Sequence, residues 1–350
     1  MVLDHPDQIS RADASDMLGA IASMSRMLTE GWEAGGGLVL PRVPQAVAVC
    51  GLGGSAIGGD LLAVLLEASS PAPVLTIRAE ALPAFAGPQT LVFLCSYSGD
   101  TEETLAAYEE ARRAGAMVVA VTSGGRLADL ARAQRVPLAL VRAGLQPRAA
   151  LPLLLLPMLR VAASCGLTGA GEREVREAAG LLAGLVSRWG PHVSSAGNPA
   201  KALAAALHGV MPAVYASSPR LEPVARRWKT QFNENSKRFG VFNAFPELVH
   251  NEIVGWEAVK AGGPPIHVVL LRDAHDTPRA ARRVEAASEI IAGRARGITE
   301  VWSQGSGLLA RLFSLILFGD LVSVYLAVLE GADPTSVEPI ARIKARLREP

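Results

Sequence analysis

The stretch Ala46-Val47-Ala48-Val49-Cys50-Gly51-Leu52-Gly53-Gly54-Ser55 decides the fold, because a short apolar run passes directly into a glycine-rich turn where a helix should begin. Glycines allow close approach of the backbone, and the first N–H groups of a helix attract an anion. The pattern Gly51-x-Gly53-x-x-Ala56 also fits a relaxed dinucleotide fingerprint, with Glu80 in the place of a ribose-binding acid. A tight turn without any ligand is the third interpretation.

Short apolar runs alternate with helical patterns along most of the chain. Continuous apolar strands separated by helices are typical of a parallel sheet that is covered on both faces. We expect strands at 46–50, 74–77, 91–95, 117–121 and 138–141, and in a second unit at 213–216, 266–271 and 299–302. The sequence therefore predicts an α/β chain of two domains, divided as residues 1–170 and 171–350.

The charge composition of the chain limits the kinds of molecule that it is expected to bind. The 350 residues include 34 Lys and Arg and 33 Asp and Glu, a net charge of +1 without a basic stripe. Neither nucleic acid nor an anionic membrane is expected as a partner. The cysteines Cys50, Cys95 and Cys165 lack CxxC spacing and are typical of reduced thiols. Since the first residues also lack the pattern of a signal peptide, we expect a cytoplasmic protein.

The most membrane-like stretch of the chain spans residues 308–329. Arg311 and the pair Gly319-Asp320 interrupt it, and both would be costly at the middle of a bilayer. We therefore expect a long helix that is buried in the protein or at a subunit interface.

A second loop, of a different type, follows the expected strand at 91–95. In Ser96-Tyr97-Ser98-Gly99-Asp100-Thr101, three short hydroxyls are suited to donating hydrogen bonds to one phosphate, together with backbone amides. The alternative is an N-cap, in which Thr101 only begins the next helix. Both loops lie at the carboxyl ends of strands, where open parallel sheets bind ligands. Together they favour a phosphomonoester over a dinucleotide.

Polar segments in the second half of the chain concentrate groups for proton transfer. The run Asn233-Glu234-Asn235-Ser236-Lys237 and the stretch 246–256 are flanked by Phe and Trp residues. That apolar mass can bury part of each segment, and a buried polar group without a partner costs about 1–3 kcal/mol. Glu234 and His250, if held in such a place, can act as general base and general acid.

These motifs together closely resemble the bifunctional phosphoglucose/phosphomannose isomerases of the sugar isomerase (SIS) domain superfamily. The motifs that carry the resemblance are the glycine loop at 53–60, the serine loop at 96–104, Gln146-Pro147-Arg148, the run at 233–237 and His250-Asn251-Glu252. The resemblance implies two SIS domains, each a parallel β-sheet flanked by helices in a three-layer α/β/α sandwich. It also implies an isomerase that needs no cofactor.

The resemblance assigns the substrate phosphate to the two loops of the first domain. Four hydroxyl residues match the phosphate-binding positions: Ser55, Ser96, Ser98 and Thr101. The backbone of Gly53 and Gly54 belongs to the same substrate loop.

The resemblance also assigns catalytic roles. Glu234 matches the base that moves a proton between C1 and C2, and Arg148 matches the cation that stabilises the enediolate. His250 matches a group that helps to open the pyranose ring and that reaches the site from the partner subunit, which implies a homodimer. Lys344, on the expected C-terminal helix, matches a lysine assigned to ring opening.

The implied reaction is the interconversion of glucose 6-phosphate, and of mannose 6-phosphate, with fructose 6-phosphate through ring opening and a cis-enediolate. A carboxylate with a raised pKa can remove the weakly acidic C2 proton, and a fixed guanidinium can stabilise the enediolate without reorganisation. The six histidines are scattered without paired ligand spacing, so no metal is expected.

Each catalytic residue also has an ordinary structural interpretation. Glu234 could cap its helix or pair with Lys237. Arg148 could be a surface arginine, and His250 could be a core histidine with satisfied hydrogen bonds. The helix dipole alone favours a lysine at the position of Lys344. For the whole chain, the alternatives are a non-catalytic SIS protein that senses a sugar phosphate and a nicotinamide-dependent enzyme.

Two positions bear on how closely the chain follows the family. Asp100 stands where asparagine is common, and a carboxylate beside a phosphate repels it unless the side chain turns away and caps its own helix. In the family, a small threonine facing C2 is held responsible for acceptance of mannose. Thr335 is the nearest threonine in this chain, and its place in the site is left open.

Overall fold

The computed structural model describes residues 2–259 and 265–347, and these form two compact units. We call them the N-terminal unit and the C-terminal unit after the sheets that they contain. The N-terminal unit comprises residues 23–183 and 305–310, and the described parts of 1–22, 184–304 and 311–350 form the C-terminal unit. The units therefore differ from two consecutive domains, 1–170 and 171–350, because the first helices of the chain belong to the C-terminal unit.

Buried contacts explain why the N-terminal segment joins the C-terminal unit. Leu3 and Ile9, from the 3-10 helix η1 (Val2–Asp4) and helix α1 (Pro6–Ala12), are 0% and 1% exposed. The ammonium group of Lys201 donates a hydrogen bond of 2.6 Å to the carbonyl oxygen of Leu3. Burial lowers the pKa of Lys201, so this backbone acceptor compensates for lost hydration.

The N-terminal unit is built on a five-stranded sheet in which all neighbouring strands are parallel, in the order β2-β1-β3-β4-β5. Every residue of β3 and β4 is buried, as expected for apolar strands covered on both faces. The strands are β1 (Ala46–Cys50), β2 (Val74–Ile77), β3 (Thr90–Cys95), β4 (Met117–Thr122) and β5 (Leu138–Leu140). All five were expected from the sequence.

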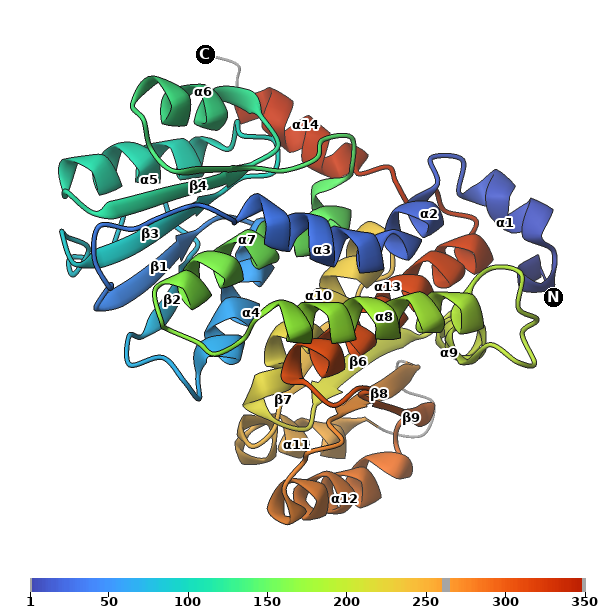
Figure 1. Ribbon diagram of the computed structural model, residues 1–350. Helices are drawn as coiled ribbons and strands as arrows, with labels where there is room; N and C mark the ends of the chain where they lie inside the picture. The colour runs from blue at the N-terminus through green and yellow to red at the C-terminus, as the bar shows by residue number, and fades with distance from the viewer. Residues whose placement is uncertain (1, 260–264, 348–350) are drawn as a thin grey trace. The chain divides into compact units, whose positions relative to one another are not determined.

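Helices cover both faces of this sheet (Figure 1). On one face, α5 and α6 share a buried cluster in which Tyr108 packs with Val92 of β3. On the other face, α4 approaches β1 so closely that a Cβ atom on Gly59 would lie 2.9 Å from the Cβ of Val49. The helices of this unit are α3 (Met24–Ala34), α4 (Gly54–Leu66), α5 (Glu102–Arg113), α6 (Gly125–Ala133), the 3-10 helix η2 (Pro147–Ala150) and α7 (Leu151–Ser164).

The C-terminal unit contains a four-stranded parallel sheet in the order β7-β6-β8-β9. Its strands are β6 (Met211–Ala216), β7 (Val241–Ala244), β8 (Ile266–Arg272) and β9 (Gly297–Trp302). The sequence predicted β6, β8 and β9 but not β7. Only one of the four residues of β7 is buried, so its pattern lacks the continuous apolar run of the other strands.

Helices also flank the second sheet on both faces (Figure 1). On one face, Val284 and Ile291 of α12 pack with Val268 and Leu270 of β8. On the other face, α10 packs against β6 and β7. The further helices of the chain are α2 (Met17–Ala22), α8 (Glu172–Trp189), α9 (Pro199–Leu207), η3 (Pro219–Leu221), α10 (Glu222–Glu234), η4 (Glu247–His250), α11 (Glu252–Gly255), η5 (Trp256–Ala258), α12 (Pro278–Ala292), α13 (Leu308–Glu330) and α14 (Glu338–Leu347).

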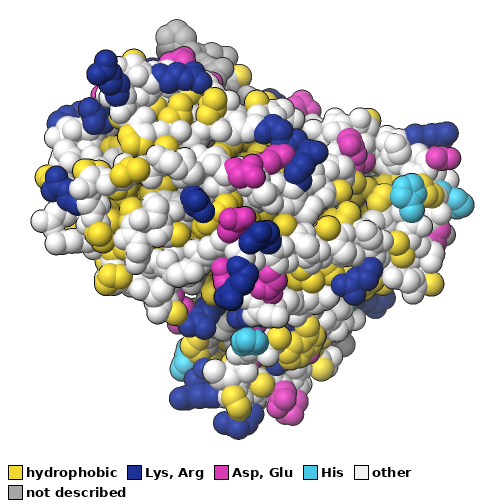
Figure 2. Space-filling model, in the orientation of Figure 1, with side chains coloured by type: hydrophobic (Ala, Val, Ile, Leu, Met, Phe, Trp, Pro, Cys, Tyr) yellow, Lys and Arg dark blue, Asp and Glu magenta, His cyan; other side chains and the backbone are white. Residues whose placement is uncertain are grey.

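Charged side chains of both signs are interspersed on the face of the molecule in Figure 2. The ion pairs of the described residues include local ones, such as Arg26 with Glu30 at 3.0 Å and Arg173 with Glu174 at 2.8 Å. Exposed pairs of this kind contribute about 0–1 kcal/mol each. On this face, the mixture of signs follows from the near-neutral composition.

Helix α13 is the central element of the C-terminal unit. Among the described residues, it alone is long and apolar enough to cross a membrane, and 94% of its most apolar window is buried inside the protein. Its one acidic residue before the last turn, Asp320, pairs with Arg227 of α10 at 2.7 Å, and both side chains are 1% exposed. Trp228 lies beside this pair and donates a hydrogen bond of 3.0 Å to the Leu315 carbonyl. The expectation of a buried helix is confirmed.

Gly319 is the contact point between α13 and α10. A Cβ atom at this position would lie 2.3 Å from the indole of Trp228. We predict that Gly319→Ala lowers the free energy of unfolding by about 1–3 kcal/mol through overpacking, as measured by urea denaturation. Gly180, on the exposed side of α8, has nothing within 4 Å of such an atom. Gly180→Ala is the control and should raise stability by about 0.5–1 kcal/mol; equal effects of the two changes would contradict the packing argument.

Candidate active site

The glycine loop is shaped by close approaches of the backbone. Gly51 follows β1, and a Cβ atom there would lie 2.8 Å from the Cys95 carbonyl oxygen at the end of β3. Gly53 has a φ of 53°, in the region that favours glycine, and it forms the N-cap of α4. Ser55, in the first turn of α4, is 5% exposed. The loop therefore brings the start of α4 and the Ser55 side chain to the carboxyl ends of β1 and β3.

Two of the candidate phosphate-binding hydroxyls in the serine loop lie within hydrogen-bond distance of each other. The Ser96 and Thr101 hydroxyl oxygens lie 2.8 Å apart, and Ser96 Oγ also accepts a hydrogen bond of 3.1 Å from the Gly99 N–H. Thr101 occupies the N-cap position of α5, but within the described residues its side chain caps no backbone N–H. The interpretation of Thr101 as an ordinary N-cap is therefore not supported. Ser98 is exposed, and its hydroxyl accepts from the Asp100 N–H at 3.3 Å.

Arg148 is not a surface arginine. It lies in η2, and the residue is 4% exposed. A Cβ atom on Gly54 would lie 3.2 Å from the Cα of Arg148, so η2 packs directly against the beginning of α4. The arginine and the glycine loop are thus neighbours within the N-terminal unit.

Asp100 turns away from its own helix. Its carboxylate accepts a hydrogen bond of 3.1 Å from the Arg126 N–H at the start of α6. Gly125 permits this contact, because its φ is 67° and a Cβ atom there would lie 2.3 Å from the Ser98 carbonyl oxygen. A cap on its own helix, α5, was the condition under which Asp100 would not repel a phosphate; the helix whose N–H it accepts from is instead α6. The carboxylate is thereby compensated by a helix N-terminus.

Glu234 is the last residue of α10 and is partly buried. The residues that follow tie this end of α10 to α13. Asn235 donates a hydrogen bond of 2.8 Å to the Ser323 hydroxyl, and the Ser236 hydroxyl donates one of 2.6 Å to the Ser323 carbonyl. Asn235 and Ser236 are 0% and 1% exposed. The asparagine and serine of the motif therefore fix the end of the helix that carries Glu234.

Lys237 links Glu234 to a distant segment of the C-terminal unit. Its ammonium group donates hydrogen bonds to the backbone carbonyls of Glu234, at 2.7 Å, and of Asp333, at 2.5 Å. Asp333 in turn accepts from the Thr335 N–H at 2.8 Å through its carboxylate. The segment that carries Thr335 is thus held at the end of α10, beside Glu234.

His250 is exposed at the end of η4, so the interpretation as a core histidine is wrong. Glu252, two residues later, is held by side chains from two strands of the sheet. The Glu252 carboxylate accepts hydrogen bonds from the Tyr215 hydroxyl and, at 2.6 Å, from the Asn243 amide. Burial and the neighbouring Glu252 raise the pKa of Tyr215, so the phenol stays protonated and remains a donor.

Lys344 lies in the last turn of α14 with its side chain exposed. Glu338 stands in the first turn of the same helix, so the charges of α14 follow the helix dipole. The position of Lys344 therefore agrees with the helix-dipole interpretation as well as with the implied role in ring opening. The candidates thus fall into two sets, with the phosphate loops and Arg148 in the N-terminal unit and Glu234, His250 and Lys344 in the C-terminal unit.

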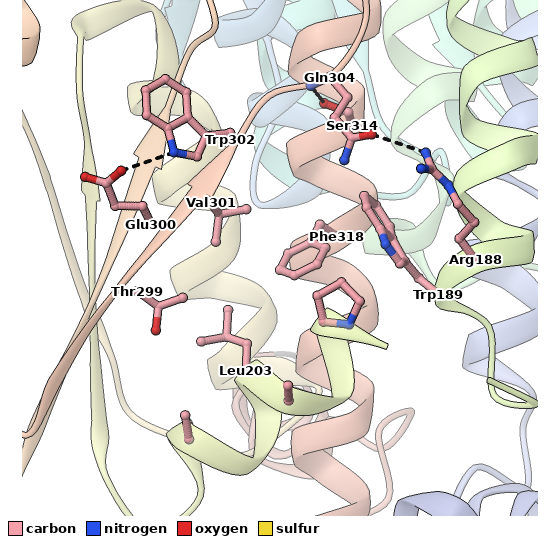
Figure 3. A pocket seen from close by; sticks show the side chains of 13 residues that line it. Arg188, Trp189, Leu203, Thr299, Glu300, Val301, Trp302, Gln304, Ser314 and Phe318 are labelled. Carbon is pink, nitrogen blue, oxygen red and sulfur yellow. Dashed lines mark hydrogen bonds between the residues drawn. The ribbon is translucent and has the colours of Figure 1, made fainter. Parts of the chain in front are cut away.

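Figure 3 shows a pocket of about 630 Å³ in the C-terminal unit, between β9, α9, α13 and the end of α8. Trp189, Leu203 and Phe318 form its apolar wall. Glu300 and Trp302 lie at one side, joined by a hydrogen bond of 3.1 Å. None of the candidate catalytic or phosphate residues lines this pocket. A pocket without an acid–base pair or a hydroxyl loop does not supply the predicted chemistry.

Known proteins match this chain over most of its length. The family described as "Bacterial phospho-glucose isomerase C-terminal SIS domain" matches residues 196–347. A bifunctional phosphoglucose/phosphomannose isomerase of Caldicellulosiruptor bescii is 42% identical over 303 residues, which are 87% of this chain and 89% of the relative. The chain belongs to this isomerase family. The relative of the same description in Aquifex aeolicus is 34% identical over 87% of this chain and 91% of its own length.

Solved structures agree with the fold of this isomerase family. A glucose-6-phosphate isomerase like protein from Thermus thermophilus superimposes with a TM-score of 0.63. The match covers 98% of both chains at 24% sequence identity. At that identity the likeness shows the fold: two parallel sheets, each flanked by helices.

Sequence reasoning missed the residues that support the isomerase motifs. Tyr215 and Asn243 hold Glu252, yet neither stands in a motif. Tyr215 lies near the carboxyl end of β6. A phenol at that place in a strand was the one signal in the sequence that could have identified it. Asn243 lies in β7, the strand that the sequence did not predict.

The contact between Asp100 and α6 can be tested directly. We predict that Asp100→Ala lowers the free energy of unfolding by about 0.5–2 kcal/mol, because the helix loses its capping acceptor. Hydrogen exchange at the Arg126 amide should become faster in the same variant. Asp100→Asn keeps an oxygen acceptor and serves as the control, with stability close to that of the parent. Unchanged exchange at Arg126 in Asp100→Ala would refute this assignment.

Proposed function

We propose that the chain is a cofactor-independent isomerase that interconverts glucose 6-phosphate, and mannose 6-phosphate, with fructose 6-phosphate by ring opening and a cis-enediolate. The observation that carries the proposal is the pairing of Ser96 with Thr101 at 2.8 Å, next to a glycine loop against which Arg148 is buried. The relatives named as phosphoglucose/phosphomannose isomerases support the same reaction.

The N-terminal unit supplies the handle for the phosphate. The first turn of α4 offers backbone N–H groups beside Ser55, and the serine loop adds short hydroxyls at the end of the next strand in the sheet. Because Asp100 is turned to the N-terminus of α6, its charge is partly compensated where a phosphate would bind. Arg148 supplies a cation that can stabilise the enediolate as negative charge develops on the substrate oxygens.

The C-terminal unit supplies the proton-transfer groups. Glu234 takes the C2 proton of the open-chain aldose and returns it at C1, so that the same carboxylate acts as base and then as acid. The hydrogen bonds of Asn235 and Ser236 to Ser323 limit the positions that the Glu234 backbone can take. A fixed base is an advantage because both carbon atoms must lie within its reach. Lys237 holds the segment of Thr335, the candidate for the residue facing C2, beside this base.

His250 and Lys344 are assigned to ring opening, which requires a proton at the ring oxygen and removal of one from the C1 hydroxyl. The exposure of His250 fits a group that acts in the active site of a partner subunit. We therefore include a homodimer in the proposal, with His250 donated across the interface. The cytoplasm is the compartment proposed, because Cys50 and Cys95 are buried free thiols and burial raises the pKa of Cys50 to about 12.

The first test is turnover. Purified protein without added metal or nucleotide should convert fructose 6-phosphate to glucose 6-phosphate, which is measured in the quenched reaction after the protein has been removed. Glu234→Gln should lower kcat by roughly 10²–10⁴-fold, because the amide cannot accept the proton. Binding of fructose 6-phosphate, measured by calorimetry, should change little in that variant.

Two alternatives give different results in these measurements and in a matching titration with a nicotinamide dinucleotide. A non-catalytic sugar-phosphate sensor would bind fructose 6-phosphate without turnover in the parent protein. A nicotinamide-dependent enzyme, suggested by Gly51-x-Gly53-x-x-Ala56, would bind the dinucleotide tightly. The isomerase proposal fails in either case.

The second test asks whether the active site is shared between subunits. Glu234→Gln and His250→Ala should each be inactive alone. If each site takes its glutamate from one subunit and its histidine from the other, a mixed dimer has one intact site. Random mixing makes half of the dimers mixed, so about a quarter of the parent activity should return after unfolding and refolding the two variants together.

The control mixes Glu234→Gln with Glu234→Ala, which cannot produce an intact site in any dimer. Activity should then stay at the level of the single variants. If the first mixture also stays inactive while size-exclusion chromatography shows dimers, Glu234 and His250 serve the same site within one chain.

A further inference from the structure

The two sheets of the chain share one strand order. In the N-terminal unit the order is β2-β1-β3-β4, followed by β5, and in the C-terminal unit it is β7-β6-β8-β9. In both, the first strand of the unit pairs with the second on one side and with the third on the other. Strand β6 therefore corresponds to β1, and β8 corresponds to β3. By the same correspondence, the loop after β8 is the counterpart of the serine loop after β3.

In the C-terminal unit, three donors at this place converge on one internal carboxylate, that of Asp276. The hydroxyl of Ser217, the residue after β6, donates to Asp276 Oδ1 at 2.8 Å. Arg272, at the end of β8, donates through Nε to Oδ2 at 3.2 Å. The Asp273 N–H donates to Oδ2 at 3.3 Å. A short hydroxyl, a backbone amide and a guanidinium are the donors that proteins use for anions.

The carboxylate that receives these donors is enclosed. The side chain of Asp276 is 5% exposed, and Ser217 is 1% exposed. By contrast, Asp100 in the serine loop is exposed and turned to the next helix. Asp100 and Asp276 thus both follow the third strand of their unit, but only Asp276 accepts a hydrogen bond from the residue that follows the first strand.

The balance of charges around Asp276 disfavours the binding of another anion. Arg272 also binds Glu300 at 2.7 Å. The second buried arginine, Arg311, binds Asp273 at 2.8 Å. Two guanidinium groups therefore face three carboxylates. A phosphate added to this cluster would increase the excess of negative charge, which is costly in a buried place.

We propose that Asp276 is the built-in occupant of an anion site in the C-terminal sheet, at the position where the N-terminal sheet offers its loops to the substrate phosphate. The carboxylate keeps the site filled and closes this sheet to phosphosugars. That the N-terminal loops bind a phosphate rests on the proposed function. The anion site itself rests on the contacts of Asp276.

Chemical rescue tests the proposal without any measurement of turnover. Asp276→Ala removes the carboxylate and leaves Ser217 and Arg272 around the space that it filled. The melting temperature should fall by roughly 2–12 °C in sodium chloride. Sodium formate at equal ionic strength should recover about half of this loss or more, because formate binds only the folded form. Asp276→Asn fills the space with a neutral amide, so formate and chloride should act alike on it.

Asp129→Ala is the matched control for a general effect of formate, since Asp129 forms an exposed pair with Arg132 at 3.6 Å. Equal melting temperatures of Asp276→Ala in formate and chloride would overturn the proposal, as would a melting temperature equal to that of the parent. If Asp276→Ala does not fold in chloride, recovery in formate supports the proposal and failure in both salts overturns it.

A binding measurement addresses the second half of the proposal. In equilibrium dialysis, fructose 6-phosphate should saturate the parent protein at one molecule per chain. Two molecules per chain would show that the C-terminal sheet is open and would overturn the proposal. Absence of any binding would contradict the proposed function instead, and the formate experiment would still decide on Asp276.

Discussion

The buried pair of Arg227 and Asp320 is the constraint on which the C-terminal unit depends. Asp320 stands in a long, buried apolar helix, and a carboxylate there is tolerated only if it is paired and hydrogen-bonded. Arg227 binds both of its oxygens, at 2.7 and 3.1 Å, and Gln231 adds a third hydrogen bond of 3.0 Å. Both partners lie on α10, so this helix can meet α13 in only one register. Glu234 is the last residue of α10, so this register also sets the position of its backbone.

The sequence predicted what depends on local pattern. Apolar runs separated by helical periodicity identify a covered parallel sheet, and the carboxyl ends of its strands identify the loops that meet there. Strand β7 was missed because Val-Phe-Asn-Ala is short and contains Asn243. The partner of Asp100 was also missed, because it depends on how closely α6 approaches the serine loop. Contacts such as that of Lys237 with Asp333, which lie 96 residues apart, leave no trace in local pattern.

The two aspartates after the third strands show how one architecture supports two outcomes. Glycines with positive φ at Gly99 and Gly125 let the N-terminal loop open toward α6, so the Asp100 carboxylate turns to the Arg126 N–H. The loop at 273–277 contains no glycine, and Asp276 stays with Ser217. Backbone freedom at two positions thus separates a loop that can receive a ligand from one that is filled by its own side chain.

The membership of residues 2–22 in the C-terminal unit has a consequence for folding during synthesis. Leu3 and its partner Lys201 are 198 residues apart. At about 5–20 residues per second, roughly 10–40 s pass between the synthesis of the two. During that time the apolar side of α1 has no native surface to cover it, while residues 23–183 can already collapse around their own sheet. The beginning of the chain therefore acquires its native contacts only after a long delay, although it is synthesised first.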